Sequence, residues 1–295
     1  MLTGHFTLGA IAVDGFFLLS GYLIFASWLK TPRVWSFAKK RILRIYPAFI
    51  MASFVSVAIA AWLNDHEMRA YLFRGRVLAQ ALSLSRPTDP TTGVELNVAL
   101  WTIRYEFLCY AIVGMLGLAG LLKRSWGLLL LWAFSLGASL YDFSDSDHPV
   151  IASLARFIPF FLTGGMFYLY RKQIPFRRVY ALVAFALVML AFFNVRLSGA
   201  LLPLAGGYLL FFIGFMDARI LAKLRPTNDI SYGLYLYGWP LQKAILWCLA
   251  ISSPWVFSGI ALPIAAIVGL LSWKLIEEPF MRRKPVVSTS DLSRD

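Results

Sequence analysis

Two arginines three positions apart, Arg41 and Arg44, are the first residues of this chain whose type and spacing suggest chemistry. They lie in the segment WSFAKKRILRIYP (35–47), and residues 30–44 contain basic but no acidic side chains. On a helix, Lys40, Arg41 and Arg44 share one face, because residues three and four positions apart are neighbours. Guanidinium groups match phosphate oxygens, so this face is a candidate site for a phosphate-bearing ligand. The same charge is also typical of a loop that the positive-inside rule keeps in the cytoplasm.

Glu106 is the second candidate, in the apolar run LNVALWTIRYEFLCY (96–110). A carboxylate among apolar and aromatic side chains is a candidate for general acid–base catalysis, because its surroundings set its proton affinity. Asp14 is a similar carboxylate in the run AVDGFFLLSGYLI (12–24). We therefore take Glu106 and Asp14 as the candidate catalytic residues.

Charged residues inside apolar runs form a larger group: Asp14, Arg104, Glu106, Arg156 and Lys243. Charge within a membrane is costly and usually faces a protein interior or a water-filled cavity. Counted from the expected helix ends at ~1.5 Å per residue, all five lie ~10–15 Å below the same membrane surface. They predict a shared polar cavity, and the alternative is an ion-pair network that holds the helices together. Arg104 and Glu106, two positions apart, must point to different faces.

An aromatic stripe lies near the C-terminal end, in DISYGLYLYGWPLQKAI (229–245), where Tyr232, Tyr235, Trp239 and Gln242 recur at helical spacing. Pro240 frees a backbone carbonyl and is expected to kink this helix. The stripe is typical of helix packing or an interfacial belt, and equally of a ligand wall. The predicted ligand cavity has these members: Trp101, Arg104, Arg156, Tyr232, Tyr235, Trp239, Gln242 and Lys243.

Metal and redox chemistry receive no support from the sequence. The three histidines, His5, His66 and His148, lie outside the apolar runs, and no spacing suits a metal site. Cys109 and Cys248 both fall inside apolar runs and indicate no disulfide framework. We expect no metal and no cofactor.

The composition predicts a membrane protein that is all-α and polytopic. Of 295 residues, 59% are hydrophobic and 15% charged, which is too apolar for a soluble domain of this size. Long apolar runs indicate transmembrane helices. We predict nine spans, with a turn at 196–199 between the sixth and the seventh: 8–29, 45–63, 97–121, 126–141, 150–170, 179–195, 199–216, 230–250 and 256–276. Residues 1–285 are expected to form a single membrane-embedded domain, followed by a disordered cytoplasmic tail, 286–295.

The net charge of +13 follows the positive-inside rule and is not the footprint of nucleic-acid binding. Basic residues collect in every second connection, and Asp142, Asp145 and Asp147 lie in one of the alternate connections. This pattern places the C-terminus in the cytoplasm and the N-terminus outside. One more helix before the first span would give ten spans and a cytoplasmic start.

Several segments together resemble the acyltransferase-3 family of integral membrane acyltransferases. AVDGFFLLSGYLI (12–24) is similar to G-V-D-x-F-F-x-x-S-G-x-L-I, and FAKKRILRIYP (37–47) to F-x-x-x-R-x-x-R-I-x-P. LWTIRYEFLCY (100–110) is similar to W-S-L-x-x-E-x-x-x-Y, and ISYGLYLYGWPLQ (230–242) to I-S-Y-x-x-Y-L-x-H-x-P. SWKLIEEPFMRR (272–283) resembles the closing S-x-x-x-x-E-x-P. Five motifs in order, over residues 8–283, make a specific match.

The resemblance implies transfer of an acyl group, commonly acetyl, from acyl-CoA to a hydroxyl of a carbohydrate or related acceptor. It associates Arg41 and Arg44 with the donor and maps the glutamate motif onto Glu106. The family begins with a helix that carries an arginine and the histidine taken as catalytic base, and the motifs here begin after that helix. His5 does not inherit the role, and Gly238 stands where many relatives have histidine.

We therefore predict an integral membrane acyltransferase, in the inner membrane of a bacterium, that modifies polysaccharide by O-acetylation. Its partners would be acyl-CoA as co-substrate, bound by Lys40, Arg41 and Arg44, a carbohydrate or lipid-linked glycan acceptor, and the lipid bilayer. Two alternatives stay open: a transporter or flippase, which the same deep charges suit, and a truncated, inactive acyltransferase.

Overall fold

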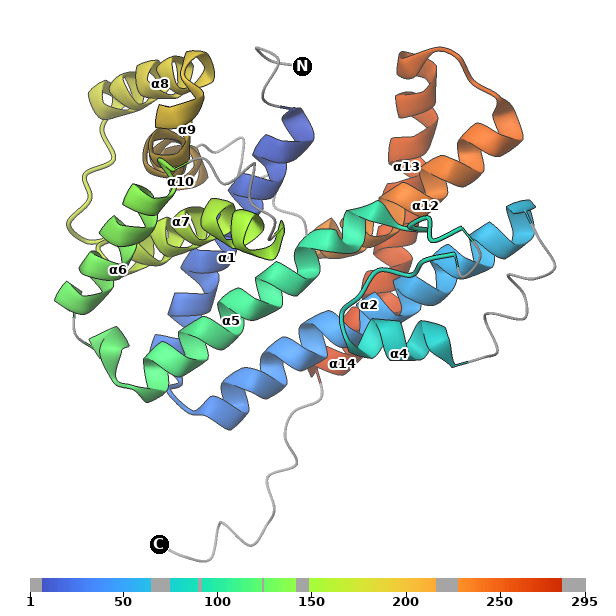
Figure 1. Cartoon of the computed structure of the whole chain (residues 1–295), viewed down its shortest axis with the longest axis horizontal. Coiled ribbons are helices and arrows are strands. Elements are labelled where there is room, and N and C mark those ends of the chain that lie inside the picture. The colour runs from blue at the N-terminus through green and yellow to red at the C-terminus, as the bar shows by residue number, and fades with distance from the viewer. Residues whose placement is uncertain are drawn as a thin grey trace, which may run out of the picture. The chain divides into compact units, whose positions relative to one another are not determined.

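The computed structural model describes residues 7–64, 75–89, 92–123, 125–141, 149–215 and 228–282. Every regular element in these ranges is a helix apart from one isolated bridge, Thr88 to Glu95. The chain divides into two compact units: residues 1–38 with 105–225, and residues 39–104 with 226–295. The helices confirm the all-α prediction (Figure 1).

Unit 1 contains all of α1, most of α5 and all of the helices between residues 121 and 215. Their bounds are α1 Leu8–Lys30, α5 Ile103–Leu118, η2 Leu121–Lys123, α6 Ser125–Ala138, α7 Pro149–Leu169, α8 Arg178–Phe193, α9 Val195–Leu201, the π-helix η3 Leu202–Gly206, and α10 Gly207–Phe215.

Unit 2 contains most of α2 and the C-terminal helices. Their bounds are α2 Val34–Asn64, α4 Arg76–Leu82, η1 Val98–Thr102, α12 Ser231–Leu249, α13 Pro254–Ser272, the π-helix η4 Trp273–Glu277, and α14 Glu278–Arg282.

Six helical stretches among the described residues are long and apolar enough to cross a membrane: Leu8–Lys30, Val34–Leu63, Val98–Leu118, Pro149–Leu169, Leu197–Phe215 and Pro254–Met281. Two shorter apolar helices are Trp126–Ala138 and Arg178–Phe193. The polytopic membrane class is supported, and the count of nine spans stays a prediction.

One predicted boundary is wrong. The turn expected at 196–199 lies two residues earlier, because α8 ends at Phe193 and Asn194 caps the next helix. The Asn194 side-chain oxygen accepts a hydrogen bond from the Leu197 N–H at 3.2 Å. Asparagine is a strong N-cap residue, so Ser198 and Gly199 continue the helix rather than break it.

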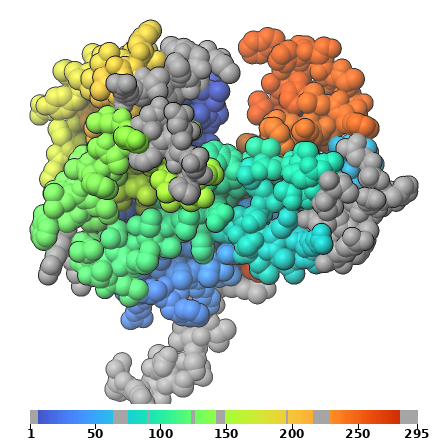
Figure 2. Space-filling view, in the orientation of Figure 1, coloured from blue at the N-terminus to red at the C-terminus, as the bar shows by residue number. Residues whose placement is uncertain are grey.

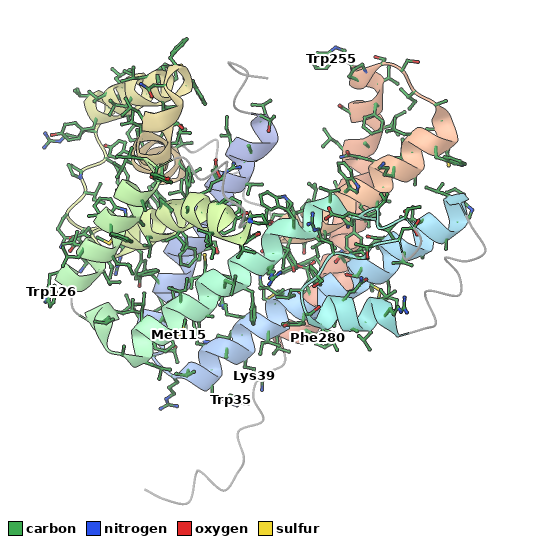
Figure 3. The ribbon with its side chains drawn as sticks, in the orientation of Figure 1. Trp35, Lys39, Met115, Trp126, Trp255 and Phe280 are labelled. Atoms are coloured by element: carbon green, nitrogen blue, oxygen red, sulfur yellow. The ribbon has the colours of Figure 1, made fainter. Side chains whose placement is uncertain are left out.

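Exposed apolar side chains give both units lipid-compatible surfaces. The tryptophans Trp35, Trp126 and Trp255 are exposed and project from their helices (Figure 3). Helices α8 and α13 lie at the surface in the space-filling view (Figure 2). Their exposed large apolar side chains include Val179, Leu182, Phe185, Val256 and Ile267. In a bilayer this surface contacts acyl chains and needs no protein cover.

In unit 1, α1 and α7 touch backbone to backbone. A Cβ added to Gly21 would come within 1.9 Å of the Phe161 carbonyl oxygen, and one added to Gly164 within 1.9 Å of the Leu18 carbonyl oxygen. Small residues at a helix crossing allow close packing in membranes, where van der Waals contact drives association.

In unit 2, polar side chains fix η1 and α12. Asn97 is fully buried, and its amide donates to the Leu236 carbonyl at 2.9 Å and to the Ser56 hydroxyl at 3.0 Å. Leu236 is the residue whose carbonyl Pro240 cannot pair, because proline has no N–H for the residue four positions earlier. The carbonyl that Pro240 was expected to free is therefore satisfied by Asn97.

Candidate functional site

Glu106 lies buried in unit 1 at the end of a short hydrogen-bond chain. Its carboxylate accepts a hydrogen bond from the Tyr110 hydroxyl, one helical turn away on α5. The Tyr110 hydroxyl accepts in turn from the Ser20 hydroxyl on α1 at 3.4 Å. The chain joins a carboxylate to two hydroxyls, and such groups can pass protons between them.

Asp14 and Arg156 form an ion pair in unit 1. Arg156 donates from Nε and Nη2 to the two carboxylate oxygens of Asp14, both at 3.1 Å, and Nη2 also donates to the Ala10 carbonyl at 3.3 Å. The Asp14 side chain is buried, and the Arg156 side chain is 39% exposed. Asp14 and Arg156 therefore fit the alternative to a shared polar cavity, which is an ion pair that holds two helices together. Both Asp14 oxygens already accept hydrogen bonds from Arg156, so an acceptor hydroxyl would have to compete with this pair.

Arg104 and Lys243, the other two deep charges, belong to unit 2, and both are exposed. Glu106 is buried whereas Arg104 is exposed, as two faces of one helix require. Trp101, on η1, is partly buried. A cavity shared by all five deep charges stays a prediction.

The predicted donor residues lie on α2. Lys40 is exposed, while Arg41 and Arg44 are partly buried. Arg44 Nη2 pairs with the Asp229 carboxylate at 2.6 Å, and its guanidinium lies 5.9 Å from the centre of the Tyr232 ring. Its Nη1 also donates to the Met281 sulfur at 3.7 Å. The planar guanidinium is the type of group that suits phosphate oxygens.

Asp229 is a charged partner that the sequence argument missed. Burial alone would raise the pKa of Asp229, but hydrogen bonds from Ser231 and Arg44 and the Arg44 charge outweigh it and hold that pKa below its usual value. The Ser231 hydroxyl donates to Asp229 at 2.5 Å. Asp229 immediately precedes the quoted segment 230–242, a position that could have drawn attention to it.

Glu277 is a second missed carboxylate in unit 2, only 1% exposed. Its Oε1 accepts from the Ser272 hydroxyl at 3.0 Å, and Oε2 has no hydrogen-bond partner within the described residues. It lies near enough to Arg44 and Asp229 for their charges to act on it. Ser272 and Glu277 are the serine and glutamate of the closing motif, so the sequence signal was present but no role had been assigned.

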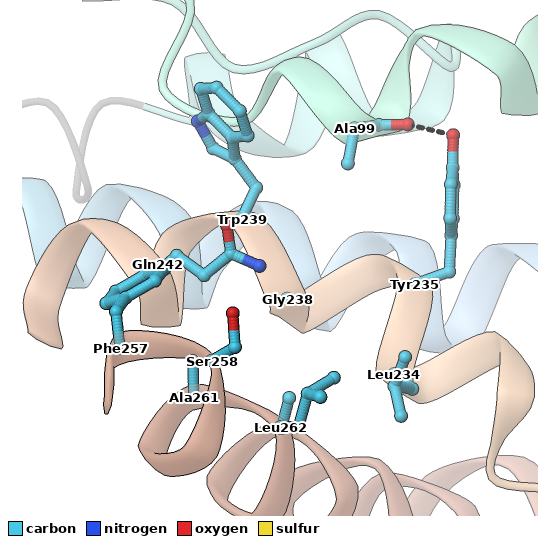
Figure 4. Close-up of a pocket in the computed structure, with 11 residues that line it drawn as sticks. Ala99, Leu234, Tyr235, Gly238, Trp239, Gln242, Phe257, Ser258, Ala261 and Leu262 are labelled. Carbon is cyan, nitrogen blue, oxygen red and sulfur yellow. Dashed lines mark hydrogen bonds between the residues drawn. The ribbon is translucent and has the colours of Figure 1, made fainter. Parts of the chain in front are cut away.

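The aromatic stripe of α12 is divided between two environments. Tyr235, Trp239 and Gln242 line a groove against α13 (Figure 4). Tyr232 instead is buried and donates to the Ile45 carbonyl on α2 at 3.2 Å, so it does not line the groove. The Tyr235 hydroxyl contacts the Ala99 carbonyl and lies 2.5 Å from the Thr102 hydroxyl. These contacts fix the wall of the groove.

Several features named from the sequence lie outside the described residues: His5, His66, His148, the aspartates Asp142, Asp145 and Asp147, and the tail 286–295. In the ranges that are described, no three His, Cys, Asp or Glu side chains are grouped as a metal site would require.

The fold and these contacts define a class: a polytopic helical membrane protein with a buried carboxylate–hydroxyl chain and a basic helix face. Comparison with known proteins identifies the family within this class. The family model described as an acyltransferase domain, that of the acyltransferase-3 family, matches residues 1–274. The chain belongs to this family and is a membrane acyltransferase that transfers groups other than aminoacyl groups.

Curated relatives match over nearly the whole chain. An O-acetyl transferase of Shigella phage Sf6 is 27% identical, over 96% of this chain and 88% of its own length. A putative membrane-bound transacylase, BcsY, of Komagataeibacter xylinus is 24% identical, over 95% of this chain and 79% of its own length. The exopolysaccharide production protein ExoZ of Rhizobium meliloti (strain 1021) is 27% identical, over 95% and 92%. No solved structure was found to match.

Proposed function

We propose that this protein transfers an acetyl group from acetyl-CoA to a hydroxyl of a carbohydrate. The observation that carries the proposal is the buried Glu106 carboxylate with its Tyr110 and Ser20 hydroxyls, in a chain of the acyltransferase-3 family. The names of two relatives support the details: one is an O-acetyl transferase, and another serves exopolysaccharide production.

The reaction balances without a cofactor. The acceptor hydroxyl loses its proton to a base as its oxygen attacks the thioester carbonyl carbon; a C–O bond forms and the C–S bond breaks. The CoA thiolate leaves and takes up a proton, so the products are the acetyl ester and free CoA. In this proposal Glu106 takes up the hydroxyl proton, and Tyr110 orients its carboxylate.

The donor assignment falls on unit 2. Arg41 and Arg44, with Lys40, present cationic donors on α2 that suit the phosphates of CoA. Asp229 holds the Arg44 side chain at 2.6 Å. An arginine that is already oriented loses less conformational entropy when it binds a phosphate.

Glu106→Gln tests the catalytic assignment. The amide is close to the same size and can still accept from Tyr110, but it cannot take up a proton. We expect the purified variant to melt like the unaltered protein and to lose at least about 100-fold in acceptor-dependent CoA release, the usual scale of general-base catalysis. Glu95→Gln, at a partly exposed ion pair with Arg86, is the control and should retain activity. Normal activity in Glu106→Gln would exclude the proton-transfer role.

Arg41→Ala and Arg44→Ala test the donor assignment. Loss of one charge-assisted hydrogen bond should weaken acetyl-CoA binding by about 1.5–3 kcal/mol, which calorimetry on purified protein can measure. Lys39→Ala removes an exposed charge of the same helix and should have little effect. Unchanged affinity in both arginine variants would place the donor elsewhere.

A further inference from the structure

The closing segment of unit 2 contains a short π-helix that brings two polar side chains together. The π-helix η4 spans Trp273–Glu277, and the Glu278 N–H donates to the Trp273 carbonyl five positions earlier. In an α-helix, residues five positions apart lie about 140° apart around the axis. The π-turn instead places Glu277 on the side of Ser272, whose hydroxyl donates to the Glu277 Oε1 at 3.0 Å. Such turns are rare, and they occur frequently at functional sites.

Glu277 is enclosed by the close packing of α12 on α13. A Cβ added to Gly233 would lie 2.9 Å from the Gly269 Cα and 3.2 Å from the Ser272 Cβ. Glu277 is 1% exposed, and its Oε2 has no hydrogen-bond partner within the described residues. A buried ionised carboxylate needs a cation or several donors, and otherwise it takes up a proton. Ser272 serves Oε1, which leaves Oε2 as the oxygen that can carry this proton.

Arg44 acts on Glu277, but it already has a carboxylate partner. Met281 lies one helical turn after Glu277 and accepts from the Arg44 Nη1 at 3.7 Å, so this face of the segment is turned toward Arg44. The charge of Arg44 acts on Glu277. Its Nη2, however, is paired with Asp229 at 2.6 Å. The three side chains carry one net negative charge when both carboxyls are ionised, and they are neutral when Glu277 is protonated.

Glu277 is the member of this cluster that can change its charge near neutral pH. Among the described residues, the other charged or titratable groups coupled to it are Arg44, Asp229 and Tyr237. Arginine stays protonated, and tyrosine in ordinary surroundings titrates near pH 10. The pKa of Asp229 lies below its usual value, so this carboxyl stays ionised. The charge of the cluster therefore follows the proton on Glu277.

We propose that binding of a donor phosphate at Arg44 is coupled to uptake of a proton by Glu277. The protonated cluster is neutral and accepts the phosphate, whereas the ionised cluster is anionic and opposes it. A phosphate at Arg44 then favours the proton on Glu277 to the same extent as the proton favours the phosphate. Glu277 does not touch the donor; it acts through the charge of the cluster. This coupling rests on the assignment of the donor to Arg44.

Calorimetry of acetyl-CoA binding to the full chain in nanodiscs, without acceptor and between about pH 6.5 and pH 8.5, tests the coupling. Acetyl-CoA has no free thiol, and a phosphomonoester titrates near about pH 6, so the ligand changes its charge little in this range. The affinity of the unaltered protein should fall about five- to tenfold as the pH rises.

Glu277→Gln isolates the charge of this side chain. The amide can still accept from Ser272 but carries no charge, so its affinity for acetyl-CoA should change less than about twofold across the range. At the alkaline end Glu277→Gln should bind more tightly than the unaltered protein. Glu95→Gln makes the same substitution at a partly exposed ion pair with Arg86 in unit 2, and it should follow the unaltered protein.

A second measurement replaces this comparison if Glu277→Gln does not fold. At about pH 7.5, binding enthalpies of the unaltered protein in buffers of different ionisation enthalpy should report uptake of a fraction of one proton. Parallel pH profiles of the unaltered protein and Glu277→Gln, or zero proton uptake, would overturn the coupling. The donor assignment would survive that result if Arg44→Ala still weakens binding. Unchanged binding in Arg44→Ala would overturn both.

Discussion

Replacing Asn97 tests whether one buried amide stabilises the proline-containing helix of unit 2. In Asn97→Leu the Leu236 carbonyl loses its donor, since Pro240 has no N–H to offer. An unsatisfied buried carbonyl costs about 1–3 kcal/mol, and measured values within membranes fall toward the lower end, about 0.6–2 kcal/mol. The Ser56 hydroxyl keeps its own acceptor, the Ala52 carbonyl at 2.7 Å, so that side chain adds little.

The stability of Asn97→Leu alone would not isolate the free energy of the hydrogen bond between Asn97 and the Leu236 carbonyl. The Asn97 side-chain oxygen is itself buried without a partner in the described residues, and Asn97→Leu removes that unfavourable group too. A double-mutant cycle with Pro240→Ala cancels this effect, because the oxygen is lost in both backgrounds. The N–H that Pro240→Ala introduces can pair the Leu236 carbonyl within the helix. We expect Asn97→Leu to cost about 1 kcal/mol less in that background.

Reversible unfolding of the purified protein in mixed micelles, followed by circular dichroism, would give the four free energies. Pro263→Ala, at a proline inside α13, is the matched control and should be additive with Asn97→Leu. A coupling between Asn97 and Pro240 within about 0.3–0.5 kcal/mol of zero would refute the argument.

Two further predictions concern charge and orientation. The pKa of Asp229 lies below its usual value in the folded protein, so its contribution to stability is present above the unfolded pKa of about 3.9 and is lost as the pH falls through the folded pKa. Melting temperatures between about pH 5 and pH 2 should therefore fall less in Asp229→Asn than in the unaltered protein. Parallel pH profiles of the two proteins would mean that Arg44 does not stabilise the carboxylate. The charge alternation places Ser252 outside and Gln173 inside, both at exposed positions. In intact cells, with the exposed Cys248 replaced by serine, an impermeant maleimide should label Ser252→Cys and not Gln173→Cys; the reverse pattern would invert the orientation.

The sequence predicted the helices and the family well, because long apolar runs and short motifs are local signals. Asp14 and Arg156 were both singled out, yet nothing local indicates that residues 142 positions apart form a pair. Pro240 indicated a free carbonyl on the preceding turn, but its partner Asn97 is distant in the sequence and no local signal pointed to it. Asn194 was a missed local signal: its N-cap chemistry outweighs the small residues that follow it.

The ion pair between α1 and α7 has a consequence for the biogenesis of this protein. Asp14 is synthesised 142 residues before its partner Arg156. At ~5–20 residues per second, α1 is complete roughly 7–30 s before α7 can neutralise its carboxylate. During that interval neither Asp14 nor the crossing surface at Gly21 has the helix that covers it in the folded protein. The insertion machinery must therefore either retain α1 or release it with a protonated Asp14, because an ionised carboxylate alone in lipid is strongly disfavoured.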